Sequence, residues 1–519
     1  MTVTARSSGT QERLEPITGA VADAFEELER RSAVPRVWDR DHTLWQDDPA
    51  EVSDRLGWLA LPGDMQERVG ELTAFADEVS EDGYSHVVVT GMGGSSLFPD
   101  VLARSFPPRA GRPRLRVLDS TDPATVQRCV EGTPLDRVLL VAASKSGTTI
   151  ETRSHLAHFW QATGGRAEQF VAITDPGTEL AKLARERGFR RLFENRPDIG
   201  GRYSALSDFG LVPAALAGID IAGMLASAAR MAAACTADVP VAANPAARLG
   251  AVIAAAARAG RNKLTLVLPP PVAAFGLWVE QLVAESTGKH GTGVLPVVGE
   301  QVGVPDVYGD DRLFVSYGQR PGTEALASAG HPVVQLPLGE ALDLGADVFR
   351  WEMAIALAGA LLDVNPFDQP DVDSAKAATS RVLERGVPSV EAEPLGPLLE
   401  QVRPGDYLAL LIYVDPAAPV VEAVERSRVA LRDRLRVATT VGIGPRYLHS
   451  TGQLHKGGPP TGVFAQVVCE SEDDMDVPGR PYTFATLLRA QAVGDLQTLR
   501  ERGLRARRVA LDELLDVGD

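Results

Sequence analysis

The sequence has few cysteines, few long apolar runs and too few basic residues to balance its acidic ones. Its three cysteines, Cys129, Cys235 and Cys469, lie far apart without metal-ligand spacing, which fits a reducing cytosol. The most apolar stretch, residues 264–278, is interrupted by prolines and is too short to span a bilayer. The N-terminus lacks the apolar core of a signal peptide. We therefore expect a cytoplasmic protein that does not bind membranes.

The net charge limits the kinds of molecule that the protein is expected to bind. Lys and Arg number 52 against 69 Asp and Glu, which gives a formal net charge of −17. A field of this sign does not attract nucleic acid or anionic membranes, so an anionic small ligand needs a local site. A length of 519 residues with 45% apolar side chains is enough for two or three α/β units.

Short apolar runs alternate with helical patterns along most of the chain, which is typical of parallel sheets covered by helices on both faces. The runs expected to form strands are residues 86–91, 114–120, 137–144 and 169–175, then 264–270, 312–318 and 331–338, and finally 407–416, 436–444 and 463–470. We predict an α/β protein with two doubly wound, flavodoxin-like parallel sheets. The expected organisation is a helical segment at 1–80, a first domain at 81–243, and a second domain with a C-terminal extension at 244–519.

The segment that follows the third run has the composition of a phosphate site. Between an apolar strand and a predicted helix stand Ser144, Lys145, Ser146, Gly147, Thr148 and Thr149. Hydroxyls, an ammonium group and backbone amides at a helix N-terminus favour an anion. The segment lacks the longer glycine-rich spacing of a triphosphate loop, so a single phosphate fits better. Ordinary capping of the helix by Ser and Thr is the alternative.

A second glycine-rich turn, GMGGSSLFP at 91–99, follows the first run. Gly94 and Ser95 in this turn would expose backbone amides to substrate oxygens. Similar turns occur in dinucleotide-binding folds, where an acidic residue follows about 20 positions later, and Asp119 is the candidate here. A nucleotide-dependent oxidoreductase is therefore an alternative, but the two loops together favour a sugar phosphate.

A carboxylate continues the apolar stripe of the helix predicted at 275–289. Trp278 and Leu282 belong to this stripe, and Glu285 follows at helical spacing. Burial would raise the pKa of such a carboxyl toward that of a working general base. A glutamate paired with Lys289 or a neighbouring arginine at the helix end is the alternative.

Two glycines precede Arg202 in GGRYSALSD, residues 200–208. A loop of this kind can bring a guanidinium close to a ligand, where it would stabilise an oxyanion developing on a sugar. An arginine that only bridges backbone carbonyls is the alternative.

These segments together resemble the glucose-6-phosphate isomerase family, which is built from two sugar-isomerase (SIS) domains. SKSGTTIET is similar to the family's phosphate signature, GMGGSSLFP to its first glycine loop, GGRYSALS to its arginine segment, and AESTGK to the stretch with its catalytic glutamate. NPFDQPDVDSAK, residues 365–376, resembles the stretch with a substrate-binding Gln and an active-site Lys, here Gln369 and Lys376. The matches follow one another in the family's order.

The resemblance implies an SIS-type aldose–ketose isomerase that interconverts glucose 6-phosphate and fructose 6-phosphate through a cis-enediol, without metal or cofactor. The implied substrate contacts are Ser144, Lys145, Ser146 and Thr149 at the phosphate, with Gly94, Ser95 and Gln369. Glu285 would move the proton between C2 and C1, Arg202 would stabilise the resulting charge, and Lys376 would assist at the ring oxygen. The family also implies a homodimer with composite sites.

The chain departs from the family in two places. The family's ring-opening histidine is expected in a GQHxF-type stretch, whereas YGQRPGTEALAS at 317–328 contains none. The chain also continues well past Lys376, and PRYLHSTGQLHKGGPPTGVF at 445–464 resembles the isomerase half of fused transaldolase–glucose-6-phosphate isomerase proteins. We predict that His455 in this extension opens the ring, with His449 and His290 in reserve. A structural turn with exposed histidines is the alternative.

Two other functions stay open at this point. A non-catalytic SIS protein that senses sugar phosphates, or a partner of a separate transaldolase, would explain the missing histidine. Neither explains the joint presence of Glu285, Arg202 and Gln369 with Lys376. A related isomerase that also accepts mannose 6-phosphate is the second possibility, because the sequence does not show which side chains face C2.

Overall fold

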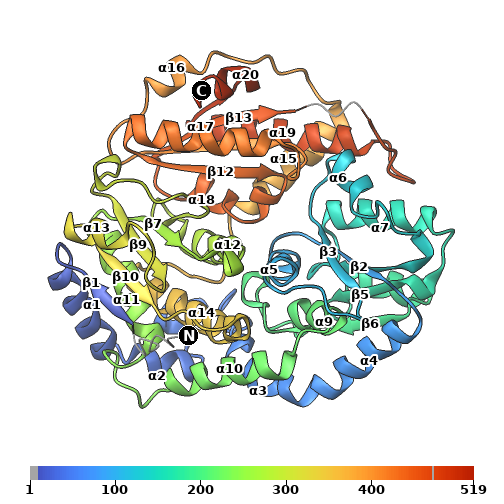
Figure 1. Ribbon diagram of the computed structural model, residues 1–519, viewed down its shortest axis with the longest axis horizontal. Helices are drawn as coiled ribbons and strands as arrows, with labels where there is room; N and C mark the ends of the chain where they lie inside the picture. Colours follow the sequence, from blue (N-terminus) through green and yellow to red (C-terminus); the bar gives the residue numbers. More distant parts are fainter. Residues whose placement is uncertain (1–9, 470–472, 519) are drawn as a thin grey trace, which may run out of the picture.

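The computed structural model describes residues 10–469 and 473–518, apart from the side chains of residues 372–376. These residues form three sheets, each covered by helices, which make three lobes around the middle of the molecule (Figure 1). In the described part of the chain, no helix combines the length and the apolar character needed to cross a bilayer.

The first lobe contains a five-stranded parallel sheet in the order β3-β2-β4-β5-β6. Its strands are β2 (His86–Thr90), β3 (Arg114–Leu118), β4 (Val138–Ala143), β5 (Phe170–Thr174) and β6 (Arg191–Glu194), and its helices are α5 (Leu97–Ser105), α6 (Pro123–Arg128), α7 (Ile150–Ala162), α8 (Glu179–Arg187) and α9 (Asp208–Leu216). Strands β4 and β5 are buried throughout, as expected for a sheet with helices on both faces.

The N-terminal segment begins beside the second lobe, at the left of Figure 1, and runs along the lower side of the molecule to the first lobe. Its helices are α1 (Thr18–Arg30), α2 (Ala33–Trp38), α3 (Leu61–Asp64) and α4 (Val69–Glu81). A short strand, β1 (Gln11–Arg13), precedes them and pairs antiparallel with the edge of the second sheet. The predicted helical character of this segment is confirmed, and the short strand was not predicted.

The second lobe contains a five-stranded sheet in the order β1-β10-β9-β7-β8, parallel except at β1. Its own strands are β7 (Lys263–Val267), β8 (Leu295–Val297), β9 (Arg312–Tyr317) and β10 (Val333–Leu336), and its helices are α10 (Ile221–Ala234), α11 (Pro245–Arg258), α12 (Phe275–Thr287), α13 (Thr323–Ser328) and α14 (Leu344–Leu361). Helix α12 faces the middle of the molecule (Figure 1).

The third lobe has a sheet of its own, in the order β12-β11-β13-β14. Its strands are β11 (Tyr407–Tyr413), β12 (Ala438–Gly444), β13 (Gly462–Val468) and β14 (Arg505–Arg508), and its helices are α15 (Val372–Arg385), α16 (Gly396–Leu399), α17 (Val420–Leu435), α18 (Gly452–Gly457), α19 (Phe484–Glu501) and α20 (Leu511–Leu515). The α/β class and the parallel sheets are confirmed. The expectation of two sheets is wrong, because the C-terminal strands pair with one another and not with the second sheet.

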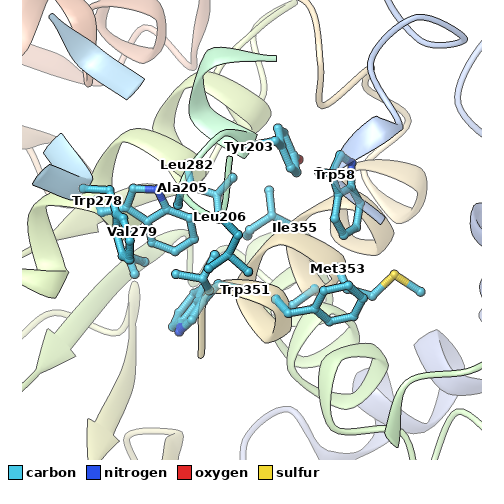
Figure 2. Close-up of a cluster of buried hydrophobic side chains, with 14 of the residues drawn as sticks. Trp58, Tyr203, Ala205, Leu206, Trp278, Val279, Leu282, Trp351, Met353 and Ile355 are labelled. Atoms are coloured by element: carbon cyan, nitrogen blue, oxygen red, sulfur yellow. The ribbon is translucent and has the colours of Figure 1, made fainter. Parts of the chain in front are cut away.

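A continuous apolar core joins α12 to α14 beneath the middle of the molecule. Trp278, Val279 and Leu282 of α12 point toward Trp351 and Ile355 of α14 in Figure 2, together with the other labelled side chains of this cluster. This packing fixes one face of α12, so the residue that continues the stripe is also directed inward.

The third lobe is tied to both of the others by buried polar contacts. On the second lobe, Arg428 donates to the Val298 carbonyl at 2.9 Å, and Arg432 lies 3.4 Å from the Glu300 carboxylate. On the first lobe, the Thr121 hydroxyl donates to the Gln491 side chain at 2.7 Å. The three lobes therefore meet around one common region.

Candidate active site

Glu285 and Arg202 form a buried ion pair in this region. Arg202 Nη1 donates to Glu285 Oε2 at 3.2 Å, and the two side chains are only 3% and 6% exposed. Gln281, one turn earlier on α12, donates to the same carboxylate oxygen at 3.3 Å. Burial raises the pKa of Glu285 above its ordinary value, and the Arg202 charge limits the rise. A carboxylate in this setting is suited to accept and return a proton.

The guanidinium of Arg202 is held by backbone carbonyls as well. Its Nη2 donates to the Asp368 carbonyl at 2.6 Å and to the Pro366 carbonyl at 2.9 Å. Its Nη1 is 3.5 Å from the side-chain oxygen of Gln369, which is itself exposed. The two interpretations of Arg202 are thus compatible, since one guanidinium bridges carbonyls and contacts the carboxylate and the amide.

Lys289 braces the segment that carries Gln369 and does not pair with Glu285. Its ammonium donates to the Asn365 carbonyl at 2.6 Å and to Asp368 Oδ1 at 2.5 Å. Burial, helped by the Arg202 charge, lowers the pKa of Lys289 to about 7. Lys376 belongs to the first turns of α15, and its side chain lies outside the described residues.

The glycine turn after β2 packs tightly against the other loops of the site. A Cβ at Gly94 would lie 1.9 Å from the Gly201 carbonyl, so only glycine allows this approach to the arginine loop. Gly93 has a φ of +55°, and a Cβ there would lie 2.7 Å from the Gln281 amide. Ser95, in the same turn, is buried. The turn therefore brings the glycine and arginine loops together beside α12.

The hydroxyl-rich loop connects β4 to α7. The Ser144 and Thr149 hydroxyls contact each other at 2.9 Å, and Ser146 and Thr148 do so at 3.0 Å. Thr149 occupies the position before α7, yet within the described residues its side chain accepts no hydrogen bond from the first turn of the helix. Simple capping therefore does not account for the loop. The Lys145 ammonium pairs with Asp175, away from the hydroxyls.

A cavity of about 160 Å³ opens above this loop. Residues from three elements of the third lobe close it. The lining consists of Ser146, Thr148, Thr149, Ile150, Glu151, Thr379, Ser380, Leu448, His449, Gln491 and Asp495. Ser146, Thr148 and Thr149 therefore face a space that another lobe closes, whereas Ser144 is buried behind them and does not line it.

His449 stands in this cavity, opposite the first turn of α7. Its Nε2 lies 2.8 Å from Glu151 Oε1, and the Gln491 amide donates to the same oxygen at 2.7 Å. Burial opposes ionisation of Glu151, but the interaction with His449 outweighs it and lowers the pKa of this carboxyl. A carboxylate that contacts one ring nitrogen fixes the orientation of an acid/base histidine.

His455 lies elsewhere, in the core of the third lobe. Its ring packs against Tyr407, Tyr447 and Phe464, and neither ring nitrogen has a hydrogen-bond partner among the described residues. Burial lowers the pKa of His455 to about 3. The assignment of ring opening to His455 does not fit this environment, because an imidazole enclosed by aromatic rings cannot reach a ligand.

Gln281 connects the two halves of the site. Its amide donates to Glu285 at 3.3 Å and to the His449 carbonyl at 3.0 Å. Glu285 itself is not among the residues that line the cavity, and Gln281 links it to the His449 backbone. A short series of contacts therefore leads from Glu285 through Gln281 and His449 to Glu151 at the start of α7.

Sequence reasoning did not single out Gln281, Glu151 or Gln491. Gln281 stands one turn before Glu285, which is a usable signal on a helix. Glu151 stands in the SKSGTTIET segment that carries the phosphate loop. Gln491 comes from a helix far along the chain, and no local pattern points to it.

Comparisons of the sequence with known proteins identify the same family each time. A sequence model of the family described as phosphoglucose isomerase matches residues 70–304. A glucose-6-phosphate isomerase from Rubrobacter xylanophilus is 31% identical over 421 residues, which cover 68% of this chain and 93% of that protein. A second, from Thermosynechococcus vestitus, is 29% identical and covers 74% of this chain and 84% of that protein.

Solved structures share the fold. A hypothetical protein from Thermus thermophilus superposes with a TM-score of 0.61 at 24% identity, over 72% of this chain and all of that one. A glucose-6-phosphate isomerase from Chlamydia trachomatis gives a TM-score of 0.54 at 19% identity, over 72% of this chain and 86% of that one.

Proposed function

The chain belongs to the phosphoglucose isomerase family, and from this premise we propose that it interconverts glucose 6-phosphate and fructose 6-phosphate through a cis-enediol. The observation that carries the proposal is the buried Glu285–Arg202 pair, in which a carboxylate with a raised pKa lies against a guanidinium. A base and an adjacent cation are what proton transfer next to a carbonyl requires.

The substrate phosphate binds at the hydroxyl-rich loop in this proposal. Ser144, Ser146 and Thr149 supply hydroxyls there, and the N-terminus of α7 adds the favourable end of a helix dipole. Lys145 acts indirectly, because its ammonium is held by Asp175. Gly94, Ser95 and Gln369 lie at the sugar end as the resemblance implies.

Ring opening is assigned to His449. With Nε2 directed at Glu151, Nδ1 of the imidazolium form delivers its proton to the ring oxygen, and the O1 proton passes to solvent. The resemblance gives Lys376 an assisting role at the same oxygen.

Isomerisation then follows at the open chain. Glu285 removes the C2 proton of the aldose as O1 gains one, which gives the cis-enediol. The same carboxylic acid returns its proton to C1, and the O2 proton is lost as the ketone forms. Arg202 stabilises the oxyanion that develops at either oxygen.

A coupled assay tests the activity directly. Fructose 6-phosphate is supplied, and glucose 6-phosphate is read through a dehydrogenase that reduces NADP⁺. Turnover supports the proposal. Binding of fructose 6-phosphate without turnover would instead favour a non-catalytic sugar-phosphate protein or a partner of a transaldolase. A parallel assay with mannose 6-phosphate decides whether the C2 epimer is also converted.

The proposal includes a cytoplasmic homodimer, as the resemblance implies. Light scattering coupled to size-exclusion chromatography gives the mass in solution, to be compared with 55.2 kDa for one chain. Cell fractionation tests the location.

A further inference from the structure

Five consecutive residues of the third lobe, Arg446 to Ser450, make contacts with all three lobes. The Ser450 hydroxyl donates to Glu280 of α12 at 3.2 Å, in the second lobe. The Tyr447 hydroxyl donates to Asp495 at 2.7 Å, within the third lobe. The remaining side chains of this turn reach the first lobe or line the cavity. The turn that carries His449 is therefore held in place by contacts with all three lobes.

Arg446 attaches the turn to the first lobe. Its Nε lies 2.7 Å from Asp119 and its Nη1 3.4 Å from Asp100. Asp119 is also the acceptor of the Ser96 hydroxyl, at 3.4 Å, at the end of the glycine turn. Ser96 and Asp119 are buried, whereas the side chains of Arg446 and Asp100 are 18% and 14% exposed, so the joint is largely shielded from water.

The partner of Tyr447 is itself firmly fixed. Asp495 lines the cavity, and its other oxygen lies 2.6 Å from the Lys456 ammonium, with both side chains almost fully buried. The Tyr413 hydroxyl contacts that of Tyr447 at 2.9 Å. A buried and fully paired network of this kind holds a backbone segment in one position.

We propose that the third lobe completes the active site within one chain, by placing His449 against Glu151 and Gln281 of the same chain. A family enzyme with composite sites takes part of each site from a second copy. Here the third lobe of the same chain supplies His449. The inference rests on the proposed function, and it holds whether or not two chains associate.

Oligomers that combine two different inactive variants distinguish a site completed within one chain from a site shared between two chains. Glu285→Gln and His449→Gln chains, each with a different affinity tag, are expressed together and purified through both tags. Each variant alone is first shown to be folded by circular dichroism and inactive in the coupled assay. His449→Gln keeps an amide that can donate to Glu151, which protects the interface.

If each chain holds a complete site, the mixed oligomer has no activity beyond that of the two separate variants. If sites are shared between chains, the mixed dimers isolated through both tags recover about half of wild-type activity, because each of them has one intact site of two. Recovery at that level would overturn the inference. If no mixed oligomer forms, activity of the wild-type monomer supports the inference, and an inactive monomer overturns it.

The wild-type assay keeps this test distinct from that of the proposed function. A wild-type protein without isomerase activity refutes the function itself. An active wild type together with a fully active His449→Gln variant leaves the isomerase in place, but it overturns the claim that the third lobe supplies this group.

Discussion

His449 Nε2 lies 2.8 Å from Glu151 Oε1, although the two residues are 298 positions apart and belong to different lobes. Glu151 lies in the first turn of the helix that follows the hydroxyl-rich loop, and His449 ends a turn that follows β12, an edge strand of the third sheet. The contact joins the proposed phosphate site to the proposed ring-opening group, so the relative position of two lobes determines the geometry of the reaction.

The two histidines are expected to differ in their effect on catalysis. His449→Gln should lower kcat by about 10²-fold or more, because general acid–base groups contribute 10²–10⁴-fold. His455→Leu should leave kcat of the folded protein nearly unchanged, since His455 is enclosed by aromatic rings. Steady-state kinetics with fructose 6-phosphate measures both. A large loss of kcat in His455→Leu with normal kcat in His449→Gln would reverse the assignment.

The pH dependence of stability should report His455. Its pKa is about 3 in the folded protein against 6.5 for an unperturbed imidazole, so the unfolded chain binds more protons between these values. Stability therefore falls as pH drops below about 6.5, and this contribution disappears in His455→Leu. Chemical unfolding at pH 5 and pH 7.5 gives the slope for both proteins. Equal slopes in the two proteins would contradict the buried position.

Glu285→Gln should lower turnover strongly without destabilising the protein at pH 7. The expected loss in kcat is about 10²–10⁴-fold, which is typical for removal of a general base. The pKa of Glu285 is raised by burial, which means that the folded site favours a neutral group, and glutamine supplies one of the same shape. Glu186→Gln, at an exposed position of α8, is the matched control and should behave as wild type. A substantial fall in melting temperature in the first variant alone would count against this account.

The acidic limb of the kcat profile should lie above the ordinary glutamate value of 4.5, because turnover needs ionised Glu285 and burial raises its pKa. Arg202 opposes that rise, so Arg202→Gln should move the limb to still higher pH while lowering kcat. Rate measurements from pH 4 to pH 9 show the shift. A limb that moves to lower pH in the variant would be inconsistent with an Arg202–Glu285 contact.

Two variants of the hydroxyl-rich loop should separate binding from stability. Ser146→Ala removes an exposed hydroxyl that faces the cavity, so KM for fructose 6-phosphate should rise several-fold with a smaller change in kcat. Lys145→Met breaks the pair with Asp175 and leaves a half-buried carboxylate without its cation, so it should mainly lower the melting temperature. The opposite pattern would place the Lys145 ammonium on the phosphate.

Much of the fold could be predicted because the inner strands are short apolar runs. All ten predicted runs contain strands, including β4 and β11, which are buried along their whole length. The strands that were missed lie at or near sheet edges, such as β14 with the sequence RARR and β8 with the sequence LPV. One exposed face, or a proline, removes the apolar signal there. The separate third sheet was missed because strand pairing joins residues that are far apart in the sequence, and local patterns do not show which strands pair.

The candidate active site could also be predicted only in part from the sequence. Glu285 and the hydroxyl-rich loop could be recognised from local spacing, since helix periodicity and strand–loop–helix order are properties of nearby residues. His449 and His455 stand six positions apart in one loop-like segment, and no local pattern separates them. Which of them faces the cavity depends on how Tyr447 and Arg446 attach the third lobe to its neighbours.

The central claim is that one six-carbon ligand reaches from residues 144–149 to Glu285. A crystal structure with arabinonate 5-phosphate, an analogue of the cis-enediol, measures this directly. We expect the phosphate within hydrogen-bonding distance of the hydroxyl-rich loop, and the Glu285 carboxylate next to the carbons that stand for C1 and C2. A phosphate bound in another cleft, or a Glu285 carboxylate too far away for the same ligand to touch, would contradict the account.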